Sequence, residues 1–273
     1  QRDLREKAIR VLHNLSFVED PTRAFRAVRF SERFGFKISK HTENLIKSTI
    51  EMNLFDKLSG PRLYEELLLS FKETDPIRTL KRVSEFGLLK VIQSNLVFTE
   101  ELEATLGSMH ETLSWFNLLF LEEKPETGVL YLMALLSGLK EEDIKTVMER
   151  LSPSPRVKDM IIKGIVSARD VVRKLPVRDP VEIYKLLHTL KLEVILFSMA
   201  LSIDRQKKKV ISHYLTDLRN VKTVLTGDDL KKMGIQPGPV YAKILRELLD
   251  EKMRGRVKSG EDEEKFVKHV IQA

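Results

Sequence analysis

The chain has 273 residues, of which 42% are apolar and 32% are charged, and it contains no cysteine. This composition is typical of a globular protein large enough for more than one domain, and the lack of cysteine excludes disulfides and thiolate chemistry. Because the sequence has no signal peptide and no apolar run of about 18 residues, we expect a cytoplasmic protein without a membrane span.

The formal net charge of +7 is unevenly distributed along the chain. Residues 1–40 carry +5, residues 100–151 carry −7 and residues 152–210 carry +7. Two basic segments around an acidic one suit a polyanion such as nucleic acid, although basic segments are often only solvated. Charge alone leaves both interpretations open.

Nearly every segment carries apolar residues three or four positions apart, a spacing that predicts helices. The clearest predicted helices cover residues 63–72, 77–92, 103–123, 141–151, 181–201 and 241–253. Residues 8–12 are the one convincing strand candidate, and because a lone strand has no pairing partner, we expect it to belong to a sheet outside this chain. The predicted fold is an all-α, elongated, multi-domain helical array with at most one short strand.

The stretch FVEDPTRAFRAVRFSERFGF, residues 17–36, places four arginines on one side of a predicted helix, at positions 23, 26, 29 and 33. Pro21 suits the first helical position, and Asp20 suits the capping position before it. A solvated basic face and an anion-facing surface both fit this pattern.

Several other kinds of site are not indicated by the sequence. The six histidines are scattered, and there is no H-E-x-x-H motif, no G-x-x-x-x-G-K-[ST] phosphate loop and no G-x-S-x-G elbow. We therefore expect neither a metal site nor catalytic residues within this chain.

Residues 17–36 resemble the E-D-P-x-R…R-x-x-R-F segment of class II tRNA nucleotidyltransferases and bacterial poly(A) polymerases. Three further segments resemble the same family in the expected order, namely DLREKAIRVL (3–12), SGPRLYEELLLSF (59–71) and LTGDDLKKMGIQPGPVYAKILREL (225–248). The resemblance implies a neck at residues 1–88, an acidic body at 89–151 and a basic tail at 152–273, which binds tRNA.

The catalytic head of this family carries a G-S loop followed by a D-x-D pair whose carboxylates hold two Mg²⁺ ions, and no such G-S…D-x-D pattern precedes Gln1. Because the sequence begins at Gln1 without methionine, we expect an N-terminal head domain in the intact enzyme and an inactive chain without it. The resemblance implies ATP and CTP as substrates and the tRNA acceptor end as partner. A stand-alone helical RNA-binding module, or the RNA-binding part of a poly(A) polymerase, remains the alternative.

By resemblance, Asp20 and Arg23 present an acceptor and donors to the Watson–Crick edge of the incoming nucleotide, and Glu19 orients them. The capping role and this template role compete for the Asp20 carboxylate. Arg26 and Arg29 are expected to hold the template pair or the triphosphate.

The pair Arg62 and Glu66 is expected to support the neck. In the tail, residues 226–229 indicate a turn and cap, and residues 237–239 a tight connection into a helix whose first N–H groups suit a phosphate; a purely structural hairpin fits equally well. The residues expected to contact RNA are Arg33, Arg169, Arg173, Lys174, Arg178, Lys207, Lys208 and Lys209.

Overall fold

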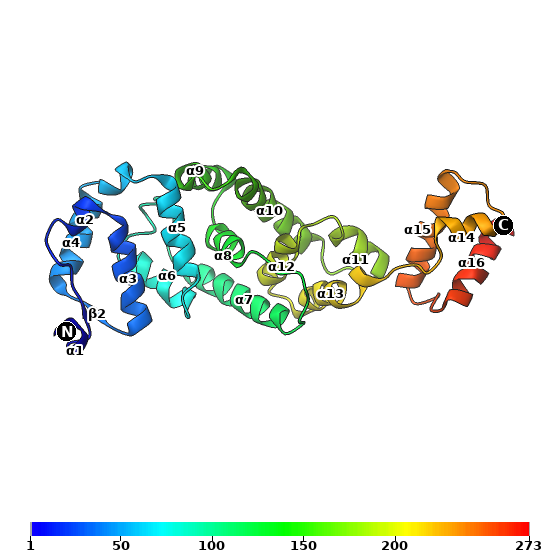
Figure 1. Cartoon of the computed structure of the whole chain (residues 1–273), viewed down its shortest axis with the longest axis horizontal. Coiled ribbons are helices and arrows are strands. Elements are labelled where there is room, and N and C mark those ends of the chain that lie inside the picture. The colour runs from blue at the N-terminus through cyan, green and yellow to red at the C-terminus, as the bar shows by residue number, and fades with distance from the viewer. Residues whose placement is uncertain (1, 273) are drawn as a thin grey trace. The chain divides into compact units, whose positions relative to one another are not determined.

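The computed structural model describes residues 2–272, and nearly all of its regular structure is helical (Figure 1). The elements are α1 (Arg2–Arg5), β1 (Ala8–Ile9), α2 (Ser16–Glu19), α3 (Thr22–Phe34), β2 (Lys37–Ile38), α4 (Lys40–Glu51), η1 (Leu54–Lys57), α5 (Gly60–Phe71), α6 (Pro76–Glu85), α7 (Glu100–Asn117), α8 (Thr127–Leu136), α9 (Glu141–Leu151), α10 (Pro155–Lys174), α11 (Pro180–Leu187), α12 (Leu192–Leu201), α13 (Arg205–Thr216), η2 (Leu218–Asn220), α14 (Gly227–Lys232), α15 (Pro239–Met253) and α16 (Gly260–Gln272). The predicted all-α fold class is confirmed.

The expectation of a lone strand paired outside the chain was wrong. The strand at residues 8–12 is shortened to β1, and it pairs in parallel with β2 in the register Ala8–Lys37 and Ile9–Ile38. A two-residue strand is too short to show an alternating pattern, so no signal for β2 is visible in the sequence.

Three predicted helices differ clearly from the structure, and the first of them, expected at residues 103–123, is α7 and ends at Asn117. The helix expected at residues 77–92 ends at Glu85, because Gly87 takes a left-handed conformation (φ 77°) and the amide of Leu88 donates to the carbonyl of Val83. The helix expected at residues 181–201 is divided into α11 and α12. No glycine or proline marks that division, and only the change from an amphipathic to a uniformly apolar segment indicates it.

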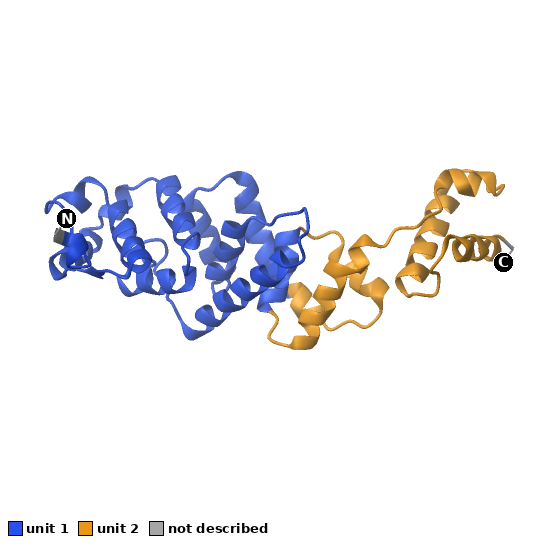
Figure 2. Cartoon of the chain, turned by 60° about the horizontal axis from the view of Figure 1, so that its bottom comes forward, with its two compact units in different colours: residues 1–169, 192–201 blue, residues 170–191, 202–273 orange. Residues whose placement is uncertain are grey.

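The chain forms two compact units (Figure 2), of which the first comprises residues 1–169 and 192–201. In this unit α3 packs against α5 and α6, and α12 returns along the chain to pack against α7 and α8. Beneath α3 the fully buried rings of Phe25 and Phe55 meet edge to face, with centroids 6.0 Å apart. This packing fixes the position of the arginine-bearing helix α3.

The end of α9 lies directly against the turn that precedes α5. Arg150 donates from Nη1 to the carbonyl of Leu58 (3.0 Å) and from Nη2 to the carbonyl of Phe55 (2.6 Å). Gly60 lies so close to this helix end that a Cβ atom there would be 2.3 Å from the carbonyl oxygen of Arg150. The two segments are therefore packed backbone to backbone.

The second unit comprises residues 170–191 and 202–273. Within it α11 packs against α13, η2 and α15. Helices α14 to α16 enclose a core of their own, formed by Leu230, Ile244, Leu248, Val257 and Val267. None of the helices within residues 2–272 is both long and apolar enough to cross a membrane. The division into neck, body and tail stays a prediction.

Candidate functional site

Asp20 lies between α2 and α3, and both of its carboxylate oxygens have partners. Oδ1 accepts hydrogen bonds from the backbone amide (3.1 Å) and the hydroxyl (2.7 Å) of Thr22, and Oδ2 lies 2.9 Å from Nη2 of Arg62. Partial burial alone would raise the pKa of Asp20, but the Thr22 donors and the Arg62 charge outweigh it and lower the pKa below its ordinary value. The side chain is therefore a fixed carboxylate.

The predicted cap at Asp20 is displaced by one position. Helix α3 begins at Thr22 and Pro21 occupies the capping position, with helical backbone angles (φ −60°, ψ −24°). The Asp20 carboxylate nevertheless satisfies the first amide of the helix.

Arg23 is held on the other side of the helix start. Its Nη1 donates to the carbonyl of Ser16 and to Oε2 of Glu19, both at 3.2 Å. Since Glu19 ends α2 and Arg23 is in the first turn of α3, this pair also links the two helices. The guanidinium keeps further N–H groups for a ligand.

Two hollows flank α3, and Arg26 and Phe30 line both of them. Asp20 and Arg62 line the first, with a volume of about 570 Å³, and Arg23 lines the second, with a volume of about 470 Å³. Arg26 is exposed and makes no hydrogen bond or ion pair within residues 2–272. Of the four arginines on α3 (23, 26, 29 and 33, the arginine stripe), Arg26 is the one most available to an anion.

Arg29 and Arg33, in contrast, are engaged by carboxylates. Arg29 is only 5% exposed, with Nη2 2.9 Å from Oε2 of Glu66 and Nη1 3.5 Å from Oε1 of Glu73, while its Nε has no partner. Arg33 binds Glu73 through two hydrogen bonds, from Nε (2.8 Å) and Nη2 (2.7 Å). Half of the arginine stripe thus joins α3 to α5 and the turn after it.

Arg62 and Glu66 lie on α5, but each pairs with the α3 region rather than with the other. Arg62 pairs with Asp20 and Glu66 pairs with Arg29. Sequence reasoning missed Thr22 and Glu73, which complete these contacts. A Thr two residues after an Asp was a local signal for the first; nothing in the sequence indicated Glu73, because it lies 44 residues from Arg29.

Several of the predicted RNA-binding residues already have structural partners. Arg169 donates from Nη2 to the carbonyls of Ser137 (2.7 Å) and Leu139 (3.1 Å), just beyond the end of α8. Arg173 and Lys174 both pair with Asp170, at 2.5 and 2.6 Å.

The remaining predicted RNA-binding residues are near the start of α11 and on α13. Lys207 donates from Nζ to the carbonyl of Val172 (2.7 Å), and Lys208 is half-buried. Arg178 and Lys209 are exposed and make no ion pair within residues 2–272. They remain the most available of this set for a phosphate.

The predicted tail turn and the connection after it are present. Asp229 accepts from the amide (3.0 Å) and the hydroxyl (2.7 Å) of Thr226 at the start of α14, and Gly238 directly precedes α15. The Thr226 donors lower the pKa of Asp229 to about 2. These contacts are those of a capping box, with Asp in place of the usual Glu or Gln.

These features define an all-α protein whose candidate site is a carboxylate-paired, arginine-rich helix. Residues 35–98 match the family described as "Probable RNA and SrmB- binding site of polymerase A". The chain is 44% identical over 269 residues to the A-adding tRNA nucleotidyltransferase of Geobacter sulfurreducens, a match that covers 96% of this chain and 31% of that protein.

Two solved structures of CCA-adding enzymes are also similar to this chain over nearly its whole length. The Thermotoga maritima CCA-adding enzyme complexed with tRNA matches 98% of this chain and 66% of its own, with a TM-score of 0.78 at 27% identity. A CCA-adding enzyme complexed with ATP matches 98% of this chain and 63% of its own, with a TM-score of 0.78 at 28% identity. The chain belongs to the tRNA nucleotidyltransferase family.

Proposed function

We propose that the chain is the neck, body and tail of an enzyme that adds nucleotides to the 3′ end of tRNA. In this proposal residues 1–88 select the base of the incoming nucleotide, and the basic tail, residues 152–273, holds the tRNA. The A-adding relative and the solved complexes with tRNA and ATP support both the reaction and the two partners.

The arrangement of Asp20 and Arg23 carries the proposal. Asp20 and Arg23 are three residues apart at the start of α3, where Arg62 and Thr22 hold the carboxylate and Glu19 holds the guanidinium. Asp20 offers an acceptor in the first hollow and Arg23 offers donors in the second, and a base edge requires both kinds of group. Arg26, between the two hollows, is placed to neutralise a phosphate of the same nucleotide, whereas the buried Arg29 acts through Glu66 as a support.

Phosphoryl transfer in this family needs Mg²⁺ on paired carboxylates, which stabilise the charge of the transferring group. Within residues 2–272 no group of three or more His, Asp or Glu side chains is arranged so that it could hold a metal ion. We place the metal-binding carboxylates in a head domain outside these residues. The unmatched length of the relatives supports this division.

Single-turnover incorporation of each of the four NTPs into tRNA lacking its 3′ end tests base selection, in an enzyme that carries the head domain. Arg23→Ala should weaken discrimination by about 10- to 100-fold, because one good bidentate base contact is worth roughly 1–3 kcal/mol. Arg23→Lys should also weaken discrimination among the NTPs, since an ammonium keeps the charge but lacks the planar, paired N–H donors of a guanidinium. tRNA affinity should change little in either variant.

An unchanged order and rate of NTP incorporation in Arg23→Ala would contradict the template role. The same assay identifies the product, because a long A run would indicate a poly(A) polymerase instead. The 273-residue chain alone, assayed in parallel, should incorporate no nucleotide. Labelled product from it would place a catalytic site within these residues.

A further inference from the structure

A third hollow, of the right size for a nucleotide, lies within the second unit. It is bounded by α11, by residues 221–223 and by α15, and its volume is about 780 Å³. Pockets for small organic ligands usually have volumes of about 300–1,000 Å³. We call it the tail groove.

Stacked aromatic rings form one wall of the tail groove. The rings of Tyr184 and His188 are nearly parallel, with an interplanar angle of 11° and centroids 4.8 Å apart. Nδ1 of His188 donates to the carbonyl of Tyr184 (3.0 Å), which fixes the ring, and the residue is exposed. A third flat ring can therefore extend the stack from His188.

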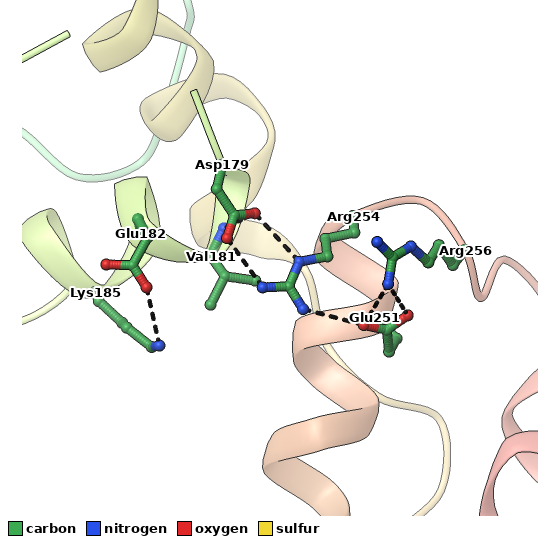
Figure 3. Close-up of polar contacts among 7 residues, drawn as sticks. All are labelled: Asp179, Val181, Glu182, Lys185, Glu251, Arg254 and Arg256. Atoms are coloured by element: carbon green, nitrogen blue, oxygen red, sulfur yellow. Dashed lines mark hydrogen bonds and ion pairs between the residues drawn. The ribbon is translucent and has the colours of Figure 1, made fainter. Parts of the chain in front are cut away.

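The opposite side of the tail groove carries cations that have no carboxylate partner. Lys222 and Arg246 line it, and neither makes an ion pair or hydrogen bond within residues 2–272. Lys185 also lines the groove but is paired with Glu182 at 3.1 Å (Figure 3). One carboxylate, Asp250, also lines the groove, so the groove suits an anionic ligand that also has a hydrogen-bond donor.

One ion pair, between Arg254 and Asp179, joins two walls of the groove. Figure 3 shows Arg254, just after α15, reaching Asp179 before α11 through Nε (3.2 Å) and Nη2 (2.9 Å), while Glu251 accepts from its Nη1 (3.0 Å). The Arg254 guanidinium also holds the pKa of Asp179 below its usual range. These contacts set the spacing of α11 and α15 before any ligand binds.

The loop that carries Lys222 is also held in place. Glu263, fully buried on α16, accepts from the amides of Val224 (2.8 Å) and Leu225 (2.9 Å). A preformed site loses less conformational entropy when a ligand binds.

We propose that the tail groove binds one unstacked nucleotide of the tRNA. Its base stacks on His188, and its phosphate lies between Lys222 and Arg246. Asp250 accepts from the ribose 2′-hydroxyl, a group that RNA has and DNA lacks. Aromatic stacking beside cations is the usual chemistry for an unpaired nucleotide. This inference rests on the proposed function, in which the tail binds tRNA.

The test uses the 273-residue chain and a fluorescein-labelled tRNA lacking its 3′ end, with binding followed by anisotropy at several salt concentrations. His188→Ala should weaken binding by about 5-fold or more, the effect of removing one stacked base, without changing the salt dependence. The double variant Lys222→Gln/Arg246→Gln should reduce the slope of log K against log[salt] by roughly 0.7–0.9 for each phosphate that the protein no longer neutralises.

The control makes the same charge change outside the groove, with Lys231→Gln and Lys243→Gln, both exposed in the second unit. It should leave the affinity closer to that of the unchanged chain. A direct readout is the NMR signal of the His188 ring during titration with tetrauridylate, which should shift in the unchanged chain and stay in place in Lys222→Gln/Arg246→Gln.

Equal decreases of affinity in the groove and control variants, or a His188 signal that tetrauridylate does not move, would overturn the tail groove as a nucleotide site. In that case tRNA binding by the unchanged chain would leave the proposed function standing. If the unchanged chain bound no tRNA at all, the proposed function would fail, and this inference would fail with it.

Discussion

The Asp20 carboxylate shows how one side chain can serve structure and function together. A carboxylate offers about four acceptor positions. At Asp20 three of them are used, two by donors of Thr22 and one by Arg62. Asp20 can therefore cap the helix and still accept a hydrogen bond from a base, so the two roles that the sequence suggested do not exclude each other. Oδ2, with one partner, keeps an acceptor position for a base.

Asp229 should make the stability of the tail depend on pH. Its pKa is about 2 in the folded chain and about 4 in an unfolded one. A lowered pKa contributes stability that is fully present above pH 4 and is lost as pH falls towards 2. Asp229→Asn should therefore lower the melting temperature near pH 6 and have little effect near pH 2.

The matched control for Asp229 is the neighbouring Asp228, which is exposed and makes no hydrogen bond through its side chain within residues 2–272. Melting curves of Asp228→Asn should follow the unchanged chain at each pH. A constant difference between Asp229→Asn and the unchanged chain from pH 6 to pH 2 would contradict the assignment.

Glu73 should be one of the most sensitive side chains of the first unit. It is 8% exposed and binds both Arg29 and Arg33. Glu73→Gln leaves the buried Arg29 guanidinium with only Glu66, and breaking a buried ion pair costs about 3–5 kcal/mol. Urea unfolding should show this decrease in stability, whereas Glu65→Gln, on the exposed side of α5, should stay within about 0.5 kcal/mol of the unchanged chain.

The arginine stripe illustrates what could be predicted for the site from the sequence. Helical spacing correctly placed the arginines on α3, because it depends on local geometry alone. Which arginines are buried depends on Glu66 and Glu73, which lie 37 and 44 residues away from Arg29. No local pattern encodes such a pairing. The sequence alone therefore could not decide whether the four arginines form a solvated face or bind an anion.

At the scale of elements, prediction succeeded where the charges at the helix ends and the apolar spacing agreed. Helix α9 has the bounds that its spacing predicted, residues 141–151, with three acidic residues in the first turn and Arg150 in the last. Helices α11 and α12 were predicted as one because their turn lacks glycine and proline. The second strand escaped prediction because its two residues depend on a tertiary partner.

Gly60 should be required for the packing of α5 against the end of α9. In Gly60→Ala the new methyl group would meet the backbone carbonyl of Arg150, which cannot rotate away as a side chain can. Overpacking of this kind costs about 1–3 kcal/mol. Gly107→Ala is the matched control, since nothing lies within 4 Å of its added Cβ in α7; it should stabilise the chain by about 0.4–1 kcal/mol. Similar effects of the two substitutions on urea unfolding would contradict the close approach.

For the whole molecule, the distribution of charge is the strongest support for the proposed position of the RNA. The acidic segment at residues 100–151 covers α7, α8 and α9, and the basic segment at 152–210 covers α10, α11, α12 and the first half of α13. Phosphates are repelled by the first and attracted by the second. Structural partners reduce the number of available cations, because Arg169 and Lys207 bind backbone carbonyls.

Lysine acetylation in the presence and absence of tRNA would map this arrangement over the whole chain. A lysine beside a phosphate reacts slowly with an amine-directed acetylating reagent, so Lys209 should be protected when tRNA binds. Lys140 and Lys145, in the acidic segment, should react at the same rate with and without tRNA; Lys145 is already paired with Glu141 at 2.7 Å. Mass spectrometry of each lysine-containing peptide gives the rates, and protection should diminish as salt rises, because phosphate contacts weaken with salt. Uniform protection of all lysines, or protection confined to residues 100–151, would show that charge does not determine where the RNA binds.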